Sequence, residues 1–425
     1  MSIDAAKFAR ARPTFWNRIR LQLGGGLILA ILIPWAVRIQ FEETEIQLAS
    51  LQTSLAGSAL ALVVGYYFFR RLSRYPGVRA SYYILPSFAA AFGTVLAVFF
   101  FARLDYSRLH FLASFVICVF WYYVVYFKLQ RQKRLRIGVV PAGQVEQLYE
   151  IEEVDWVRLA GEAKSASYDA IVADLRADMP DEWERFLADC ALDGMLVMHV
   201  KQVEESLTGR VAIEHLSENT FGSLMPGIIY GRVKRVGDFL VSIVALPVLI
   251  PVMLLVGLLI RLDSAGPVLF RQQRMGYRGR AFIMYKFRSM RVAAAPVDAR
   301  AAAMTRDEDD RVTRVGRFIR RYRIDELPQV INVLKGQMSW IGPRPEAVPL
   351  SLWYEAELPF YRYRHIVRPG ITGWAQVKQG HVADVDEVLS KLHYDFYYIK
   401  NFSFWLDLLI VAGTVRTIVN GFGAR

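Results

Sequence analysis

Cysteine and histidine are scarce in this sequence, and both shortages exclude classes of protein. Cys118 lies in an apolar run and Cys190 in a soluble-looking segment, and these two cysteines cannot form a disulfide framework. The six histidines show no i, i+4 pair and no cysteine partner of the kind that binds zinc. Nothing here indicates an oxidising compartment, and we expect no histidine metal site.

Acidic residues are too few to balance the basic ones. The chain has 52 Lys and Arg against 40 Asp and Glu, which gives a net charge of +12, and 54% of its 425 residues are hydrophobic. An excess of basic residues of this size is typical of proteins that bind a nucleic acid, a membrane surface or an anionic substrate. The hydrophobic content means that part of the chain lies in lipid.

Four apolar runs, at 21–37, 51–69, 82–101 and 109–127, each approach the roughly 20 residues that a helix needs to cross a membrane. No small-residue cleavage site follows the basic N-terminal segment, so we interpret the first run as an anchor. Basic residues follow the second and fourth runs, whereas Glu42, Glu43 and Glu45 follow the first. The positive-inside rule therefore places the N-terminus and everything from Lys128 onward in the cytoplasm. Buried soluble helices are the alternative, but they would make this charge alternation a coincidence.

A fifth apolar run, at 239–260, is also long enough to cross the membrane. Lys234 and Arg235 precede it and further arginines follow it, so both flanks carry the inside signature. Pro247 and Pro251 each delete a helical hydrogen bond. The pattern predicts a re-entrant helix-break-helix with a break near its middle, and an ordinary kinked fifth span is the alternative.

Between 135 and 224 the pattern changes to short apolar strands, at 135–140, 169–173 and 195–200, which alternate with helical stretches such as 181–192. This rhythm predicts a small α/β doubly wound domain. The first strand is followed by Pro141 to Gln144 rather than by a Gly-rich phosphate turn. A scaffolding or regulatory role is favoured, and nucleotide binding stays open.

Arginines recur at three-residue spacing from position 311, which predicts a basic stripe along a helix. The stripe consists of Arg311, Arg314, Arg317 and Arg320, with Arg321 and Arg323 close by. A stripe of this kind is usually a solvated or headgroup-facing surface, so substrate contact needs a further feature.

Asp325 and Glu326 follow the stripe and lead, through Leu327 and Pro328, into an apolar helix. Helix capping would explain Asp325, because Asp is a favoured N-cap and Pro fits the first turn. Alternatively, Asp325 is a carboxylate nucleophile beside a second carboxylate, and the pair binds a divalent cation. Attack by an ionised pair on a diphosphate meets repulsion of about 4 kcal/mol per pair of charges at about 4 Å, so cations are required. The candidates are Mg²⁺ and the side chains of Lys286, Arg288, Arg320 and Arg344.

Two stiff turns downstream each present an arginine. Residues 342–345 read Gly-Pro-Arg-Pro and present Arg344, and residues 368–373 begin Arg-Pro-Gly and present Arg368. Two rigid arginine loops suit a phosphorylated ligand, although each could be a structural turn.

The ordered motifs of the C-terminal half resemble those of the bacterial sugar transferases, also called monotopic polyprenyl-phosphate hexose-1-phosphate transferases. The resemblance runs from about residue 234 to residue 419. In order, it covers Lys234, Arg235 and Asp238 at the start of the membrane helix, Pro251 at its break, and the segments 266–267, 270–272, 286–290, 325–328, 342–345, 368–370, 373–376 and 395–398.

This resemblance implies a reaction and roles for the residues. Asp325 would attack the β-phosphate of a UDP-sugar, expel UMP and form a covalent sugar-phosphate enzyme, which undecaprenyl (polyprenyl) phosphate then attacks. Glu326 would help to hold Mg²⁺, Arg320 would lie by the phosphates, and Gln376 would contact substrate. The chain departs from the family at Ile250, where some members have Ser, and after Gln376, where many members show Asn-Gly-Arg.

Together the patterns predict an α-helical membrane domain of four helices at 1–134, the small α/β doubly wound domain at 135–226, and an α/β-type catalytic domain at 227–425 with the re-entrant membrane helix at 238–260. The first two resemble those of larger family members, which start exopolysaccharide, capsule or O-antigen synthesis. We expect a bacterial inner-membrane protein with its catalytic domain on the cytoplasmic face, in contact with the lipid bilayer, a UDP-sugar donor and a polyprenyl phosphate acceptor. Whether it forms a homo-oligomer is left open.

Three other functions would use some of these features. A non-catalytic, membrane-anchored nucleotide-binding or regulatory module would leave Asp325 and Glu326 as a mere helix cap, and UMP release by the purified protein separates it from an enzyme. A transporter would need ionisable groups inside the four spans, which hold almost none. Nucleic-acid binding lacks a groove-reading motif and an ordered aromatic platform.

Overall fold

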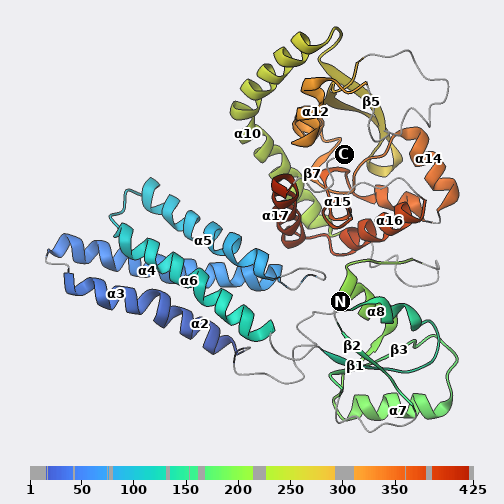
Figure 1. Cartoon of the computed structure of the whole chain (residues 1–425), viewed down its shortest axis with the longest axis horizontal. Coiled ribbons are helices and arrows are strands. Elements are labelled where there is room, and N and C mark those ends of the chain that lie inside the picture. The colour runs from blue at the N-terminus through green and yellow to red at the C-terminus, as the bar shows by residue number, and fades with distance from the viewer. Residues whose placement is uncertain are drawn as a thin grey trace. The chain divides into compact units, whose positions relative to one another are not determined.

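Figure 1 shows the computed structural model of the chain, which describes Trp16, Tyr75 and residues 18–41, 44–73, 80–130, 135–152, 154–160, 168–213, 226–291, 311–358, 360–379 and 385–420. The chain divides into two compact units, Met1–Gly209 and Arg210–Arg425.

The predicted membrane runs are confirmed as helices. The first is α2 (Ile19–Leu27), which continues through η2 (Ile28–Leu32), α3 (Ile33–Arg38) and η3 (Ile39–Phe41), and the others are α4 (Glu45–Leu72), α5 (Ser81–Phe101) and α6 (Arg108–Gln130). All four are long and apolar enough to cross a membrane. Glycines let α4 and α5 approach closely, since a Cβ at Gly57 would lie 2.3 Å from the Phe99 ring.

The middle segment is an α/β region whose four strands form a parallel sheet in the order β2-β1-β3-β4. Its elements are β1 (Arg136–Val139), η4 (Glu146–Glu150), β2 (Asp155–Arg158), β3 (Ala170–Ala173), α7 (Asp181–Leu192), β4 (Val197–His199) and α8 (Val200–Thr208). One apolar cluster packs on each face of the sheet. The sequence pattern missed β2, because this short strand is half exposed and begins and ends with a charged residue.

Helices dominate the C-terminal unit, and its sheets are small. The hairpin β5 (Leu269–Met275) and β6 (Ala281–Phe287) is antiparallel, and β7 (Ser339–Ile341) pairs in parallel with β8 (Gly370–Thr372). The helical elements are α10 (Ile228–Asp263), η5 (Tyr277–Gly279), α12 (Arg314–Arg321), η6 (Ile324–Gln329), α13 (Val330–Leu334), α14 (Val348–Glu357), η7 (Tyr361–Ile366), α15 (Trp374–Lys378), α16 (Val385–Lys400) and α17 (Phe404–Asn420).

The predicted re-entrant segment differs from expectation, because α10 is one helix of 36 residues with Pro247 and Pro251 inside it. The helix is not interrupted at Pro251, and Figure 1 shows instead that it curves. Each proline removes one hydrogen bond and pushes away a carbonyl of the preceding turn. The neighbouring hydrogen bonds persist, so the prolines bend the helix without ending it.

Both ends of α10 pack on the same C-terminal unit. Near the N-terminal end, Arg235 donates to the carbonyls of Val333 (2.6 Å) and Leu334 (3.0 Å). At the C-terminal end, Val256 and Ile260 join a buried cluster with side chains of β6 and α12. The middle of the helix is apolar and uncovered, as the 77% exposure of Val244 shows.

Candidate active site

The sharp turn between α12 and η6 places the two carboxylates. Thr313 caps the N-terminus of α12 by accepting from the Gly316 amide, and the helix ends at Arg321. Arg323 then adopts a left-handed conformation (φ 54°), which turns the chain into η6. Asp325 and Glu326 are buried in this short 3-10 helix. Asp325 is therefore not the N-cap of an α-helix, since α13 begins only at Val330.

Glu326 is held by two cations from other parts of the fold and lies near a third, Arg323, at the start of its own helix. Its Oε1 accepts from Arg344 Nη2 at 2.8 Å and from Lys286 Nζ at 3.1 Å, and Arg323 lies 3.9 Å away. Burial alone would raise the pKa of Glu326, but Arg344 and Lys286 hold it well below its ordinary value. Glu326 is thus ionised and its charge is neutralised.

Asp325 is the second carboxylate, and its surroundings differ. It is 9% exposed, and no described residue donates a hydrogen bond to its side chain or forms an ion pair with it. Burial raises the pKa of Asp325 to about 6, with a contribution from Glu326, while Lys286, Arg344 and Arg320 oppose the rise. A desolvated carboxylate without hydrogen-bond donors is a reactive nucleophile once it is ionised.

The structure brings together five of the predicted site residues: Asp325, Glu326, Lys286, Arg320 and Arg344. With Arg323, four cations surround two carboxylates, so two positive charges remain (four minus two). A net positive, buried centre attracts an anionic ligand such as a diphosphate.

Arg288 and Arg368 have other partners. Arg288 donates to the carbonyls of Ser264 (2.6 Å) and Ala265 (2.8 Å) at the C-terminal end of α10, where a cation stabilises the helix. Arg368 donates to the carbonyl of Gly336 at 3.0 Å and lies over the Tyr277 ring. Both guanidinium groups are used in joining elements of the fold, and we leave them out of the phosphate site.

The two predicted arginine turns lie side by side because β7 pairs with β8. The Gly342 amide donates to the Thr372 carbonyl at 2.8 Å, and the Gly370 amide donates to the Pro343 carbonyl at 2.9 Å. A Cβ at Gly370 would lie 2.1 Å from the Gly342 nitrogen, so this close approach requires glycine. The turns share a backbone, but their arginines have separate partners.

A buried network of charges, which sequence reasoning did not single out, orients the Arg344 turn. Arg364 donates to the Arg344 carbonyl at 2.9 Å and to Asp395 at 2.8 Å, and both side chains of this pair are at most 3% exposed. Arg274 donates to the Pro345 carbonyl at 3.0 Å. Asp395 stood in a recognised motif, but only the fold shows that it acts on the turn through Arg364.

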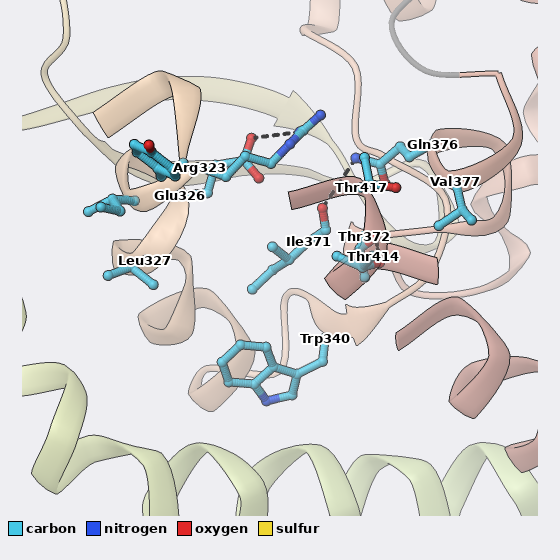
Figure 2. A pocket seen from close by; sticks show the side chains of 12 residues that line it. Arg323, Glu326, Leu327, Trp340, Ile371, Thr372, Gln376, Val377, Thr414 and Thr417 are labelled. Carbon is cyan, nitrogen blue, oxygen red and sulfur yellow. Dashed lines mark hydrogen bonds and ion pairs between the residues drawn. The ribbon is translucent and has the colours of Figure 1, made fainter. Parts of the chain in front are cut away.

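A pocket of about 210 Å³ adjoins Glu326 (Figure 2). Besides Glu326 its lining is mostly apolar and comes from η6, β7, β8, α15 and α17: Tyr322, Arg323, Ile324, Leu327, Trp340, Ile371, Thr372, Gln376, Val377, Thr414 and Thr417. Gln376, a predicted substrate contact, donates to the Ile371 carbonyl at 3.3 Å, and its buried Oε1 accepts from no described residue.

The oxygens present fit a magnesium ion only if a ligand supplies the others. Glu326 Oε2 and the Asp325 carboxylate accept no hydrogen bond from the described residues, whereas Glu326 Oε1 is taken by cations. The described residues hold no group of three or more His, Cys, Asp or Glu that would make a metal site. Mg²⁺ is commonly bound by one or two carboxylates together with substrate phosphates, and this donor set matches that case.

Comparison with known proteins places the chain in a family. The profile described as bacterial sugar transferase matches residues 229–421. A UDP-N-acetylgalactosamine-undecaprenyl-phosphate N-acetylgalactosaminephosphotransferase of Aeromonas hydrophila is 46% identical over 402 residues, which are 94% of this chain and 94% of the relative. An undecaprenyl-phosphate glucose phosphotransferase of Komagataeibacter xylinus is 46% identical over 43% of this chain and 35% of the relative. The exopolysaccharide production protein PSS of Rhizobium leguminosarum bv. phaseoli is 44% identical over 43% of this chain and 92% of the relative.

The fold and the site define a membrane enzyme with a buried acidic pair in a cationic setting. The similarity over nearly the whole chain shows more, and the chain belongs to the bacterial sugar transferase family. Two predictions from the sequence are confirmed: that the chain is a member of this family and that it is a phosphoglycosyl transferase. The non-catalytic module is therefore set aside.

Proposed function

We propose that this protein transfers a hexose-1-phosphate from a UDP-sugar to undecaprenyl phosphate through a covalent intermediate on Asp325. The contrast between two adjacent carboxylates carries the proposal. Glu326 is bound by Arg344 and Lys286, whereas Asp325 lies beside the same cations with no donor on its own oxygens. Glu326 holds the cationic side chains in place, and Asp325 is available to attack the substrate.

The two displacements balance in atoms and charge. In the first, an Asp325 oxygen forms a bond to the β-phosphorus of the UDP-sugar, while the bond from that phosphorus to the bridging oxygen breaks and UMP leaves with the electron pair. In the second, an oxygen of the lipid phosphate attacks the same phosphorus and the Asp325 carboxylate departs. Lys286, Arg320 and Arg344 stabilise the charge that gathers on the phosphoryl oxygens.

UDP-N-acetylgalactosamine is the first donor to test. The Aeromonas hydrophila relative, whose name gives that donor, is 46% identical over 94% of both chains. The relatives named for glucose match less than half of this chain. We propose a role at the start of exopolysaccharide, capsule or O-antigen synthesis.

We propose that the catalytic unit lies on the cytoplasmic face of the bacterial inner membrane, with α10 as a re-entrant helix. A helix of 36 residues is about 54 Å long, enough to cross the hydrocarbon if it were straight. Its two ends instead pack on one unit, and an exposed apolar middle separates them. An arch of this kind supports entry into one leaflet and return.

Magnesium is a further part of the proposal. Asp325 and Glu326 Oε2 are the protein oxygens that would hold it, and the bound ion would neutralise charge on the diphosphate. We expect EDTA to stop UMP release and added Mg²⁺ to restore it. An unchanged rate in EDTA would remove the metal from the proposal.

The covalent step is tested by incubating the purified full chain with UDP-N-acetylgalactosamine in the absence of lipid acceptor. We expect a burst of UMP and an increase in protein mass equal to one hexosamine phosphate, mapped to Asp325. Asp325→Asn is expected to give neither, and Asp263→Asn, a change at a carboxylate outside the site, is the control. An adduct on Asp325→Asn would refute the assignment of the nucleophile.

A further inference from the structure

The pocket beside Glu326 joins a charged end to an apolar wall. In Figure 2, Arg323 and Glu326 lie at one end of the pocket and Trp340 at the other, with α10 running past the Trp340 end. Trp340 Nε1 donates to Ser242 Oγ on α10 at 3.0 Å. The pocket therefore extends from Glu326, the neighbour of Asp325, toward the helix that carries the exposed apolar surface.

The polar groups of the wall are already satisfied within the protein. Thr372 pairs with Thr414 (2.7 Å), Thr417 donates to the Gly413 carbonyl (2.9 Å), and Trp340 donates to Ser242. Among the described wall atoms, Gln376 Oε1 and the Tyr322 hydroxyl are the exceptions. A nucleobase or a hexose carries several donors and acceptors, and most of them would lose their water in this pocket without gaining a partner. A hydrocarbon chain loses nothing there and gains the burial of its surface.

We propose that this pocket binds the hydrocarbon chain of the lipid-phosphate acceptor, in the part next to the phosphate. This assignment rests on the proposed function and locates the binding site of its second substrate, the lipid-phosphate acceptor. The phosphate then lies toward Glu326 and Arg323, within the cationic cluster, while the chain runs toward Trp340. Beyond Trp340, the exposed apolar residues Val241 and Ile243 flank Ser242 on α10, so the chain stays on an apolar surface as it enters the bilayer.

Filling the pocket tests the assignment. Thr417→Phe places a large side chain in it, Thr417→Ser keeps it open, and Val415→Phe adds the same ring at a neighbouring exposed position of α17 that does not line it. We expect Thr417→Phe to raise the KM for undecaprenyl phosphate by about tenfold or more, a loss typical of a blocked apolar pocket. The same rise is expected for a short-chain prenyl phosphate, because the pocket holds the units nearest the phosphate. The other two variants should keep the wild-type KM.

The UMP burst measured without acceptor distinguishes a failure of this pocket assignment from a failure of the proposed function. It should be unchanged in Thr417→Phe, because the donor half-reaction does not use the pocket. A burst that is lost while the acceptor KM is unchanged would overturn the proposal and assign the pocket to the donor. A wild-type burst together with a wild-type acceptor KM in Thr417→Phe would also overturn the proposal. Absence of the burst in the unsubstituted protein would instead contradict the proposed function, so the two failures are distinguishable.

Discussion

Asp325 and Glu326 are adjacent in sequence, yet their environments shift their pKa values in opposite directions. Two cations bind Glu326 directly and keep it ionised, while burial without donors raises the pKa of Asp325 to about 6. Carboxylates with separated pKa values divide the work of a site. Here the division follows from which side chain each oxygen contacts.

The raised pKa of Asp325 predicts a pH dependence. Attack requires the ionised form, so the rate of the UMP burst should rise with pH, pass its midpoint near the pKa of about 6, and level off above it. Arg320 lowers the pKa of Asp325, so Arg320→Gln should move the midpoint to higher pH. Stopped-flow measurement of the burst between acid and neutral pH checks both.

Arg368→Gln is the matched control for that shift, since Arg368 donates to the Gly336 carbonyl and contacts neither carboxylate. It should leave the midpoint where it is. A midpoint that stays in place or falls in Arg320→Gln would remove Arg320 from the surroundings of the nucleophile.

At the scale of elements, a buried ion pair orients the Arg344 turn. Arg364 and Asp395 are 2.8 Å apart and almost fully buried, and Arg364 also donates to the Arg344 carbonyl. Asp395→Asn would remove the carboxylate that pairs directly with Arg364, and breaking a buried ion pair typically costs about 3–5 kcal/mol. We expect lower thermal stability of the purified protein and a higher KM for the donor.

A surface pair provides the comparison. Asp155→Asn alters the exposed contact between Arg136 and Asp155, which lie 3.9 Å apart, and should cost less than about 1 kcal/mol. Equal thermal shifts for the two variants would contradict the structural role given to Asp395.

The curvature of α10 predicts where the chain emerges. Arg271 follows this helix, is exposed, and should face the cytoplasm if the helix re-enters. Arg271→Cys should react with a membrane-impermeant maleimide only after the cells are permeabilised, and Glu45→Cys, in the predicted external segment, should react in intact cells. Background labelling should be low, because the native Cys118 and Cys190 are buried. Labelling of Arg271→Cys in intact cells would favour a fifth span.

At the scale of the whole molecule, the relatives match different shares of the chain: the Aeromonas hydrophila protein matches 94% of it. The Rhizobium leguminosarum protein matches only 43% of this chain, yet the match covers 92% of that relative. The family profile matches residues 229–421, which lie within the C-terminal unit.

This division predicts that residues 210–425, purified in detergent, keep both the UMP burst and transfer to lipid. All the charged residues that we place at the site lie within this unit. The same fragment with Asp325→Asn is the control and should show neither activity. A folded fragment without a burst would show that the N-terminal unit takes part in the reaction.

Much of the fold followed from local pattern. The membrane helices and α7 were predicted because a period of 3.6 residues and runs of about 20 apolar residues are properties of neighbouring residues. β2 was missed because its four residues, half exposed, carry too little of the strand pattern. The break expected at Pro251 is a bend, because the hydrogen bonds on either side of the two prolines keep α10 continuous.

The site was predicted by residue type more than by position. Sequence by itself determined that two adjacent carboxylates lie among many arginines, because both features are contiguous in the chain. Only the tertiary structure decided that Arg344 and Lys286 reach Glu326 while Arg288 binds the end of α10. Charge interactions depend on distances of a few ångström between elements far apart in sequence, and such distances exist only after the chain has packed.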